Sequence, residues 1–95
     1  MRLFWTSEAL EDRDTIYDYL EARNPLAALD FDELFSEQAR LLEDHPALGR
    51  IGKKQGTREL IVHSSYYLVY DVVENDSVRV LRVLHAKRQW PSVDA

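Results

Sequence analysis

Two periods of hydrophobic and polar positions run along the chain. Between residues 7 and 44 the apolar residues recur every three or four positions, which predicts helices at about 7–22 and about 25–44. Thr6 or Ser7 is a suitable N-cap for the first helix. Asn24-Pro25 ends that helix and starts the second, since Asn caps well and Pro is tolerated at the first helical position. A short link between two helices predicts an antiparallel helical hairpin.

Strand-like segments lie on both sides of this hairpin. One is the bulky run from Arg2 to Thr6, and bulky or β-branched residues mark three more at 57–62, 66–73 and 78–84. Short links between the last three predict an antiparallel meander. The order β-α-α-β-β-β predicts an α+β fold, with the helical hairpin packed on one face of an antiparallel sheet.

The segment 47–56 breaks both periods and is expected to be a basic loop. It contains every glycine of the chain, at positions 49, 52 and 56, together with Arg50, Lys53 and Lys54. The glycine spacing matches no phosphate-binding motif. We therefore interpret these glycines as turns between a helix and a strand.

Length and composition restrict the classes of protein further. Ninety-five residues predict a single domain, here 1–91, followed by a flexible C-terminal tail at 92–95. The absence of cysteine excludes disulfides, thiolate zinc sites and thiol nucleophiles. No apolar run is long enough to span a membrane, so we expect no membrane association and a cytoplasmic location. His45, His63 and His85 lack ligand spacing, and we expect neither a metal nor a cofactor.

Charge is distributed unevenly between the two halves of the chain. Residues 1–48 carry four bases against twelve acids, and residues 49–95 carry eight bases against five acids, within a net charge of −5. Such a chain is not expected to bind nucleic acid indiscriminately. A local basic face in the second half remains compatible with this balance, as does a simple solvated surface.

The last strand supplies the candidate binding surface. Alternation predicts Arg79, Leu81, Val83 and His85 on one face and Val78, Val80, Arg82 and Leu84 on the other. One face would cover the helices, and the other would form an apolar patch with a basic rim, which is typical of binding sites. A central strand with polar ends is the alternative interpretation.

A catalytic interpretation uses some of the same residues. Histidine can act as an acid or base near neutral pH, and Arg or Lys can stabilise the extra charge on phosphorus. A metal-independent phosphodiester-cleaving set would then comprise His85 with Arg58, Lys53, Lys54, Arg79, Arg82 and Arg88. A histidine held at a strand end by hydrogen bonds is the structural alternative.

An ordered set of motifs resembles the RelE/ParE superfamily, the toxins of bacterial type II toxin–antitoxin modules. The resemblance covers nearly the whole chain, and its fold agrees with the one predicted above. The motifs are Asn24-Pro25 with Ala27-Ala28, Leu48 to Gly52, Gly56 to Leu60, Tyr67 to Tyr70, Val83 to His85, and Arg88 to Pro91.

The resemblance implies two alternative activities in the bacterial cytoplasm. RelE-like members cut mRNA on the ribosome, and ParE-like members inhibit DNA gyrase without acting as nucleases. The ending His-x-x-Arg-Gln-Trp-Pro and the Ala at position 86, where some relatives carry a functional Tyr, favour the ParE-like and plasmid-stabilisation branch. Membership of that branch implies a growth-inhibiting binding protein, which a ParD-like antitoxin neutralises in a hetero-oligomeric complex. The residues expected to contact a target or partner are Arg58, Arg79, Arg82, His85, Arg88 and Trp90.

Overall fold

The computed structural model describes residues 1–91, so the tail predicted at 92–95 lies outside the described residues. Two helices and five strands confirm the α+β prediction, and both helices end within one residue of their expected limits. The elements are β1 (Arg2–Trp5), α1 (Ser7–Glu21), α2 (Pro25–Asp44), β2 (Arg50–Ile51), β3 (Thr57–His63), β4 (Tyr66–Val73) and β5 (Ser77–His85).

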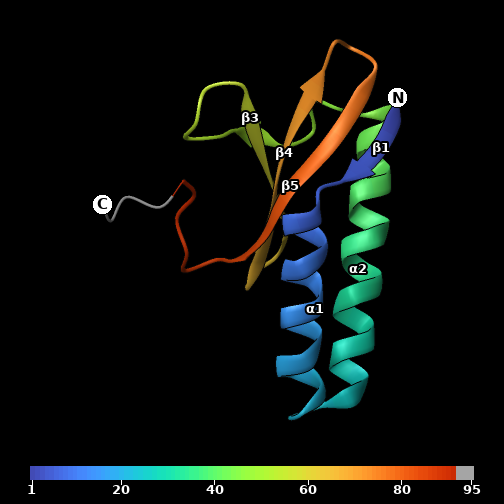
Figure 1. The fold of residues 1–95 in the computed structure, drawn as a ribbon, viewed down its shortest axis with the longest axis vertical. Coiled ribbons are helices and arrows are strands. Elements are labelled where there is room, and N and C mark those ends of the chain that lie inside the picture. The colour runs from blue at the N-terminus through green and yellow to red at the C-terminus, as the bar shows by residue number, and fades with distance from the viewer. Residues whose placement is uncertain (92–95) are drawn as a thin grey trace.

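All five strands form one sheet, in the order β1-β5-β4-β3-β2 (Figure 1). The sheet is mixed, because β1 runs parallel to β5 while the other neighbours are antiparallel. The helical hairpin reverses the chain once and the antiparallel strands β2, β3, β4 and β5 reverse it three times, so β5 runs in the direction of β1. A short strand, β2, also lies in the segment expected to be a loop, where Arg50 and Ile51 pair with Glu59 and Arg58.

Side-chain caps fix where the two helices begin. The Thr6 hydroxyl accepts a hydrogen bond from the Ala9 N–H at 3.1 Å, so Thr6 is the N-cap of α1. The Asn24 side chain accepts from the Ala27 N–H at 3.2 Å, and Pro25 follows at the first helical position of α2. Both caps act at the positions where the sequence pattern begins a helix.

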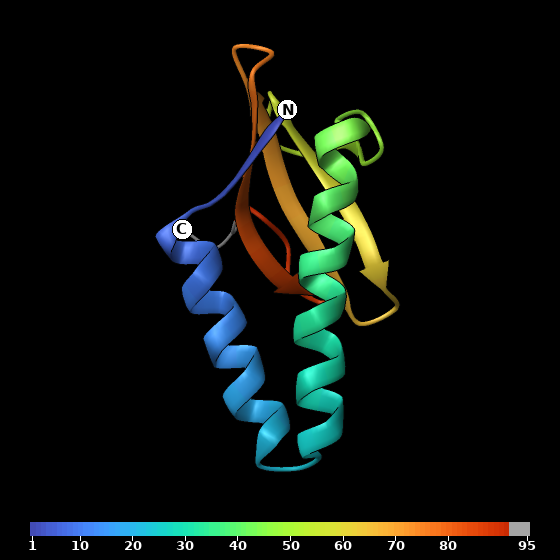
Figure 2. The same ribbon diagram turned by 90° about the vertical axis from the view of Figure 1, so that its right-hand side faces the viewer.

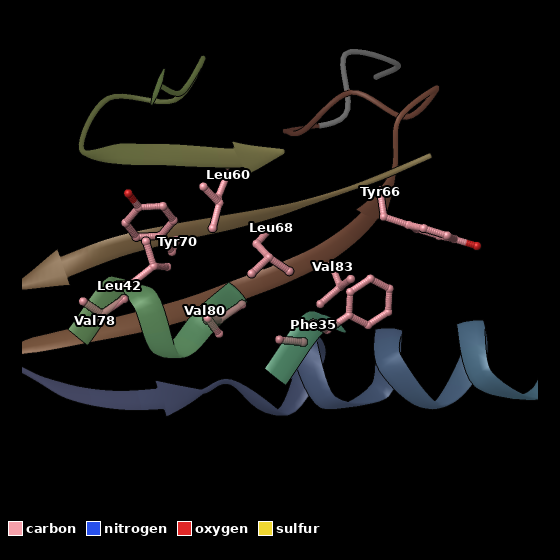
Figure 3. Packing of buried hydrophobic residues seen from close by; sticks show 11 residues of the cluster. Phe35, Leu42, Leu60, Tyr66, Leu68, Tyr70, Val78, Val80 and Val83 are labelled. Atoms are coloured by element: carbon pink, nitrogen blue, oxygen red, sulfur yellow. The ribbon is translucent and has the colours of Figure 1, made fainter. Parts of the chain in front are cut away.

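The main core lies between the hairpin and one face of the sheet (Figure 3). Phe35 and Leu42 reach it from α2 and pack with residues of the three central strands. The Tyr70 hydroxyl, at the edge of this core, donates to the Pro46 carbonyl at 2.7 Å and accepts from the Gly49 N–H at 2.9 Å. These bonds tie the chain after α2 to the middle of the sheet.

A β-bulge in β5 corrects the predicted faces of that strand. Tyr70 pairs with Val80 and Val69 pairs with Arg82, so Leu81 is an extra residue without an opposite partner. Val78, Val80 and Val83 consequently all belong to the main core, although strict alternation separates Val83 from the other two. Leu81 and Leu84 instead join a smaller cluster on the opposite face.

The hairpin is longer than the part of the sheet that it covers. Figure 2 shows both helices on one side of the sheet, with the turn between them extending beyond the strand ends. The face opposite the hairpin, called the outer face below, carries no helix among residues 1–91. Neither helix in this part of the chain has the length and apolar character needed to cross a membrane.

Candidate partner-binding site

The outer face has its own apolar cluster. Tyr67, Val69 and Leu84 are buried there, and Leu81 and Trp90 pack against them. Trp90 reaches this cluster because residues 86–91 lie across the outer face after β5, on the side away from the helices (Figure 1). The Tyr67 hydroxyl donates to the Arg88 carbonyl at 2.6 Å and so fastens this segment to β4.

Two cavities lie on the outer face, and Trp90 lines both. Each has a volume of about 270 Å³. The first cavity is lined by Arg50, Lys53, Lys87 and Arg88 among others. The second is lined by Lys54, Arg79, Arg82 and Leu81 among others. Basic side chains therefore surround an apolar centre, which is the composition expected for a patch with a basic rim.

Two of the cations on this face are paired with carboxylates. Arg50 contacts the buried Glu59 at 3.0 Å, and Arg79 contacts Asp71 on the neighbouring strand at 2.8 Å. The hydrogen bonds that Arg79 donates to the Asp71 carboxylate raise the pKa of Arg79 above its ordinary value. Within residues 1–91, no carboxylate lies within ion-pair distance of four other cations, which are Lys53, Lys54, Lys87 and Arg88. These four give the outer face its excess positive charge.

Arg82 lies at the edge of the sheet and has a structural partner. Its guanidinium contacts the Asp12 carboxylate of α1 at 2.7 and 3.0 Å. That hydrogen-bonded pairing raises the pKa of Arg82, and both side chains are largely buried. Arg82 thus offers a partner less free charge than Arg88 does.

Arg58 and His85 lie on the hairpin side of the sheet. Arg58 is opposite Tyr70 and donates to the Gly49 carbonyl at 2.7 Å. The His85 ring contacts the Tyr66 ring edge-on, with 5.6 Å between centroids, and His85 Nδ1 accepts from the Lys87 N–H at 3.1 Å. His85 also lines an apolar cavity of about 370 Å³ beneath the overhanging hairpin, together with Ile16, Tyr19, Leu20, Phe31 and Tyr66.

The structure divides the residues that the sequence suggested as one surface. Arg79, Arg88 and Trp90 gather on the outer face, Arg82 lies at the edge, and Arg58 and His85 lie behind the sheet. The candidate catalytic set is divided too, since Lys53 and Lys54 line outer-face cavities. His85 lines neither of these two outer-face cavities.

Sequence reasoning missed two parts of these sites. Tyr67 was not proposed, although its alternation with Val69 marks a second apolar face on β4. The apolar cavity beneath the hairpin, which Ile16, Phe31 and His85 line together, was not predicted either. No local pattern shows that a helix extends beyond the sheet it covers.

Comparisons with known proteins give the family. Residues 3–90 match the family described as the ParE toxin of the type II toxin–antitoxin system parDE. The toxin Y4kP of Sinorhizobium fredii is 36% identical over 92 residues, covering 97% of this chain and 95% of that protein. Toxin RelE2 of Caulobacter vibrioides is 33% identical over 87 residues, covering 92% and 97%.

Solved structures agree with that match. A chain of the chromosomal ParDE toxin–antitoxin system from P. aeruginosa superposes with a TM-score of 0.80 at 26% identity, covering 92% of this chain and 97% of that one. A YoeB/ParE toxin from Agrobacterium tumefaciens shares the fold, with a TM-score of 0.63, 18% identity and coverage of 90% and 98%. From the family match across nearly its whole length, this chain belongs to the ParE toxin family, within the RelE/ParE superfamily of toxin–antitoxin toxins.

Proposed function

We propose that this toxin inhibits growth by binding DNA gyrase, and that a cognate ParD-like antitoxin neutralises it in a plasmid-stabilisation module in the bacterial cytoplasm. The observation that carries the proposal is the position of His85. Its ring is on the hairpin side of the sheet, whereas Lys53 and Lys54 are on the outer side. A proton-transferring histidine must lie within hydrogen-bond reach of the group it serves, and this arrangement favours a binding protein over a nuclease.

The outer face supplies the surface that would bind the target. Arg88 and Trp90 lie together beside the first cavity, and both residue types are common in the energetically dominant parts of interfaces. Lys53 and Lys87 add positive charge at the same rim. Gyrase would then bind around the Trp90 side chain and the cations that surround it, and inhibition would need no covalent bond to the target.

The apolar cavity beneath the hairpin supports a second contact, with the antitoxin. It is lined by Ile16, Leu20, Phe31 and Tyr66 and is open to solvent. An amphipathic helix could bury one apolar face there. The P. aeruginosa relative comes from a ParDE toxin–antitoxin system, which supports an antitoxin as the partner.

The direct test is a supercoiling assay with purified toxin, DNA gyrase, ATP and plasmid. We expect loss of supercoiling and accumulation of cleaved DNA, both relieved by the cognate antitoxin. Arg88→Ala and Trp90→Ala should weaken the inhibition while the chain stays folded. Arg40→Ala is the matched control, since Arg40 is exposed on α2 away from this face.

A toxin that stops growth but leaves gyrase active would overturn this proposal. Because one relative is named toxin RelE2, the next assay would then be ribosome-dependent cleavage of mRNA. In that case Arg58, Lys53, Lys54 and His85 become the residues to substitute first.

A further inference from the structure

Trp90 separates two cavities of similar size on the outer face and contacts the apolar cluster between them. We propose that these cavities are the two ends of one groove, which Trp90 closes in the free toxin. An extended acidic segment of the antitoxin, with apolar side chains at alternate positions, would displace the Trp90 ring and lie along the groove. The identity of that partner rests on the proposed function.

The bonds around Trp90 allow such a movement. Ala86 and Arg88 are held by backbone hydrogen bonds, to the Ser65 carbonyl at 2.7 Å and to the His85 carbonyl at 2.9 Å. The Tyr67 hydroxyl also bonds to the Arg88 carbonyl. No backbone-to-backbone hydrogen bond within the described chain involves Trp90 itself. Trp90 is thus held by packing and by the Lys54 ammonium, 5.4 Å from its ring centroid. A rotation beyond Arg88 can release the ring without breaking the sheet.

Charge and apolar surface together select the occupant. Lys53, Lys87 and Arg88, which have no ion-pair partner among residues 1–91, line one end of the groove, and Lys54 lines the other. Between them lies the apolar cluster of Tyr67, Val69 and Leu84, which Trp90 partly covers. Carboxylates at the ends and an apolar side chain at the centre match this distribution, because alternate residues of an extended segment point in opposite directions.

A nucleic acid fits the groove less well. Glu8 lines the second cavity without an ion pair among residues 1–91, so a chain with a phosphate at every step would approach its carboxylate. The net charge of −5 also opposes a long polyanion. A peptide can place its carboxylates beside the lysines alone. Its entry would remove Trp90 from the surface that we propose for the target, which explains neutralisation by displacement.

Fluorescence of Trp90 provides the test. In full-length toxin carrying Trp5→Phe, Trp90 is the one remaining tryptophan. The probe is a short synthetic peptide of glutamates with leucines at alternate central positions. We expect binding to shift Trp90 emission to longer wavelength and to increase its quenching by acrylamide. A peptide with serines in place of the leucines should bind more weakly.

Substitutions at the groove should change the affinity for the peptide in predictable directions. Trp90→Ala should bind the peptide more tightly, on the order of tenfold if the closed form is favoured by about that ratio. Trp90→Phe should lie between, and Lys53→Glu and Arg88→Glu, each made alone, should weaken binding. Arg40→Glu, on the exposed surface of α2, is the charge-matched control and should change little. Circular dichroism checks that each variant is folded.

Three outcomes would overturn the inference. The first is weaker peptide binding by a folded Trp90→Ala variant. The second is peptide binding that leaves the Trp90 emission unchanged. The third is a toxin that binds a single-stranded oligonucleotide but not the peptide. The assay contains no gyrase, so its result is independent of the supercoiling test. Displacement could hold for a toxin with another target, and gyrase inhibition could hold without displacement.

Discussion

Asp12 and Arg82 join α1 to the edge of β5 through a two-pronged ion pair, with nitrogen–oxygen distances of 2.7 and 3.0 Å. The same carboxylate accepts the Val83 backbone N–H at 2.9 Å. The pairing of β1 with β5 ends at Val80. Beyond that point Asp12, and not a neighbouring strand, accepts the hydrogen bond from the edge of β5. One helix side chain therefore satisfies both a cation and a backbone donor at an otherwise open edge.

Replacing Asp12 with Ala should lower the free energy of unfolding by about 1–3 kcal/mol, because it leaves a partly buried guanidinium and an N–H without their acceptor. Urea denaturation measures this loss. Asp14→Ala is the matched control, since Asp14 is exposed on the same helix, and its effect should stay within about 0.5 kcal/mol. Equal losses in the two variants would show that the ion pair does not stabilise the edge.

Replacing His85 with Ala should leave growth arrest largely intact. His85 is exposed at the strand end and lies on the hairpin side, away from Trp90. Induction of the variant in cells without antitoxin gives the measurement, with Arg88→Ala as the comparison expected to reduce arrest. An abrupt loss of arrest in a folded His85→Ala variant would favour the catalytic interpretation.

The buried tyrosines should make the fold sensitive to alkali. Burial raises the pKa of Tyr66, Tyr67 and Tyr70 above 10.0. Above pH 10.0 the unfolded chain releases phenol protons that the folded chain keeps, so the free energy of unfolding falls as pH rises. The stabilisation is complete below pH 10.0 and is lost as pH rises through the raised values.

The Tyr70→Phe variant tests that dependence at one residue. Its decline in stability above pH 10.0 should be shallower than in the unaltered chain, as measured by urea denaturation over a pH series. At neutral pH the variant should be less stable by about 1–3 kcal/mol, since the Gly49 N–H and Pro46 carbonyl lose their partner. Tyr19 is 56% exposed, so Tyr19→Phe should change the free energy of unfolding at neutral pH little.

Two adjacent leucines of α2 should respond differently to truncation. Leu42 is fully buried, while Leu41 is 44% exposed. Leu42→Ala should cost about 2–5 kcal/mol through lost burial and an unfilled cavity. Leu41→Ala should cost much less, and thermal unfolding of the pair would show the contrast. Comparable shifts in melting temperature would mean that Leu41 packs more tightly than its exposure indicates.

Much of the fold follows from local signals. Thr6 and Asn24 have the hydrogen-bonding side chains that begin helices, and short turns dictate the meander. The bulge at Leu81 has no such signal, because it arises from how β4 and β5 fit together over the core. The parallel pairing of β1 with β5 is also non-local, since it joins Arg2 to Ser77.

The candidate site was predictable in residue type but not in arrangement. A basic, apolar surface near the end of the chain was expected, and Arg88 and Trp90 do lie together. His85 was assigned to the wrong neighbours because the bulge shifts the faces of β5 after Leu81. Arg82 was expected to contact a target or partner, and its ion pair with Asp12 was not predicted because the two residues are 70 positions apart in the sequence. Distant pairings of this kind leave no local pattern.

The pairing of β1 with β5 also constrains how the toxin matures during synthesis. β5 lies between β1 and β4, so the sheet cannot close until residues 77–85 have left the ribosome. Until then β1 has no neighbouring strand and the valines of β5 are missing from the core. Closing such long loops late slows folding. A nascent toxin therefore stays unfinished, and harmless by the proposed mechanism, until residues 77–85 are free to pair with both neighbouring strands.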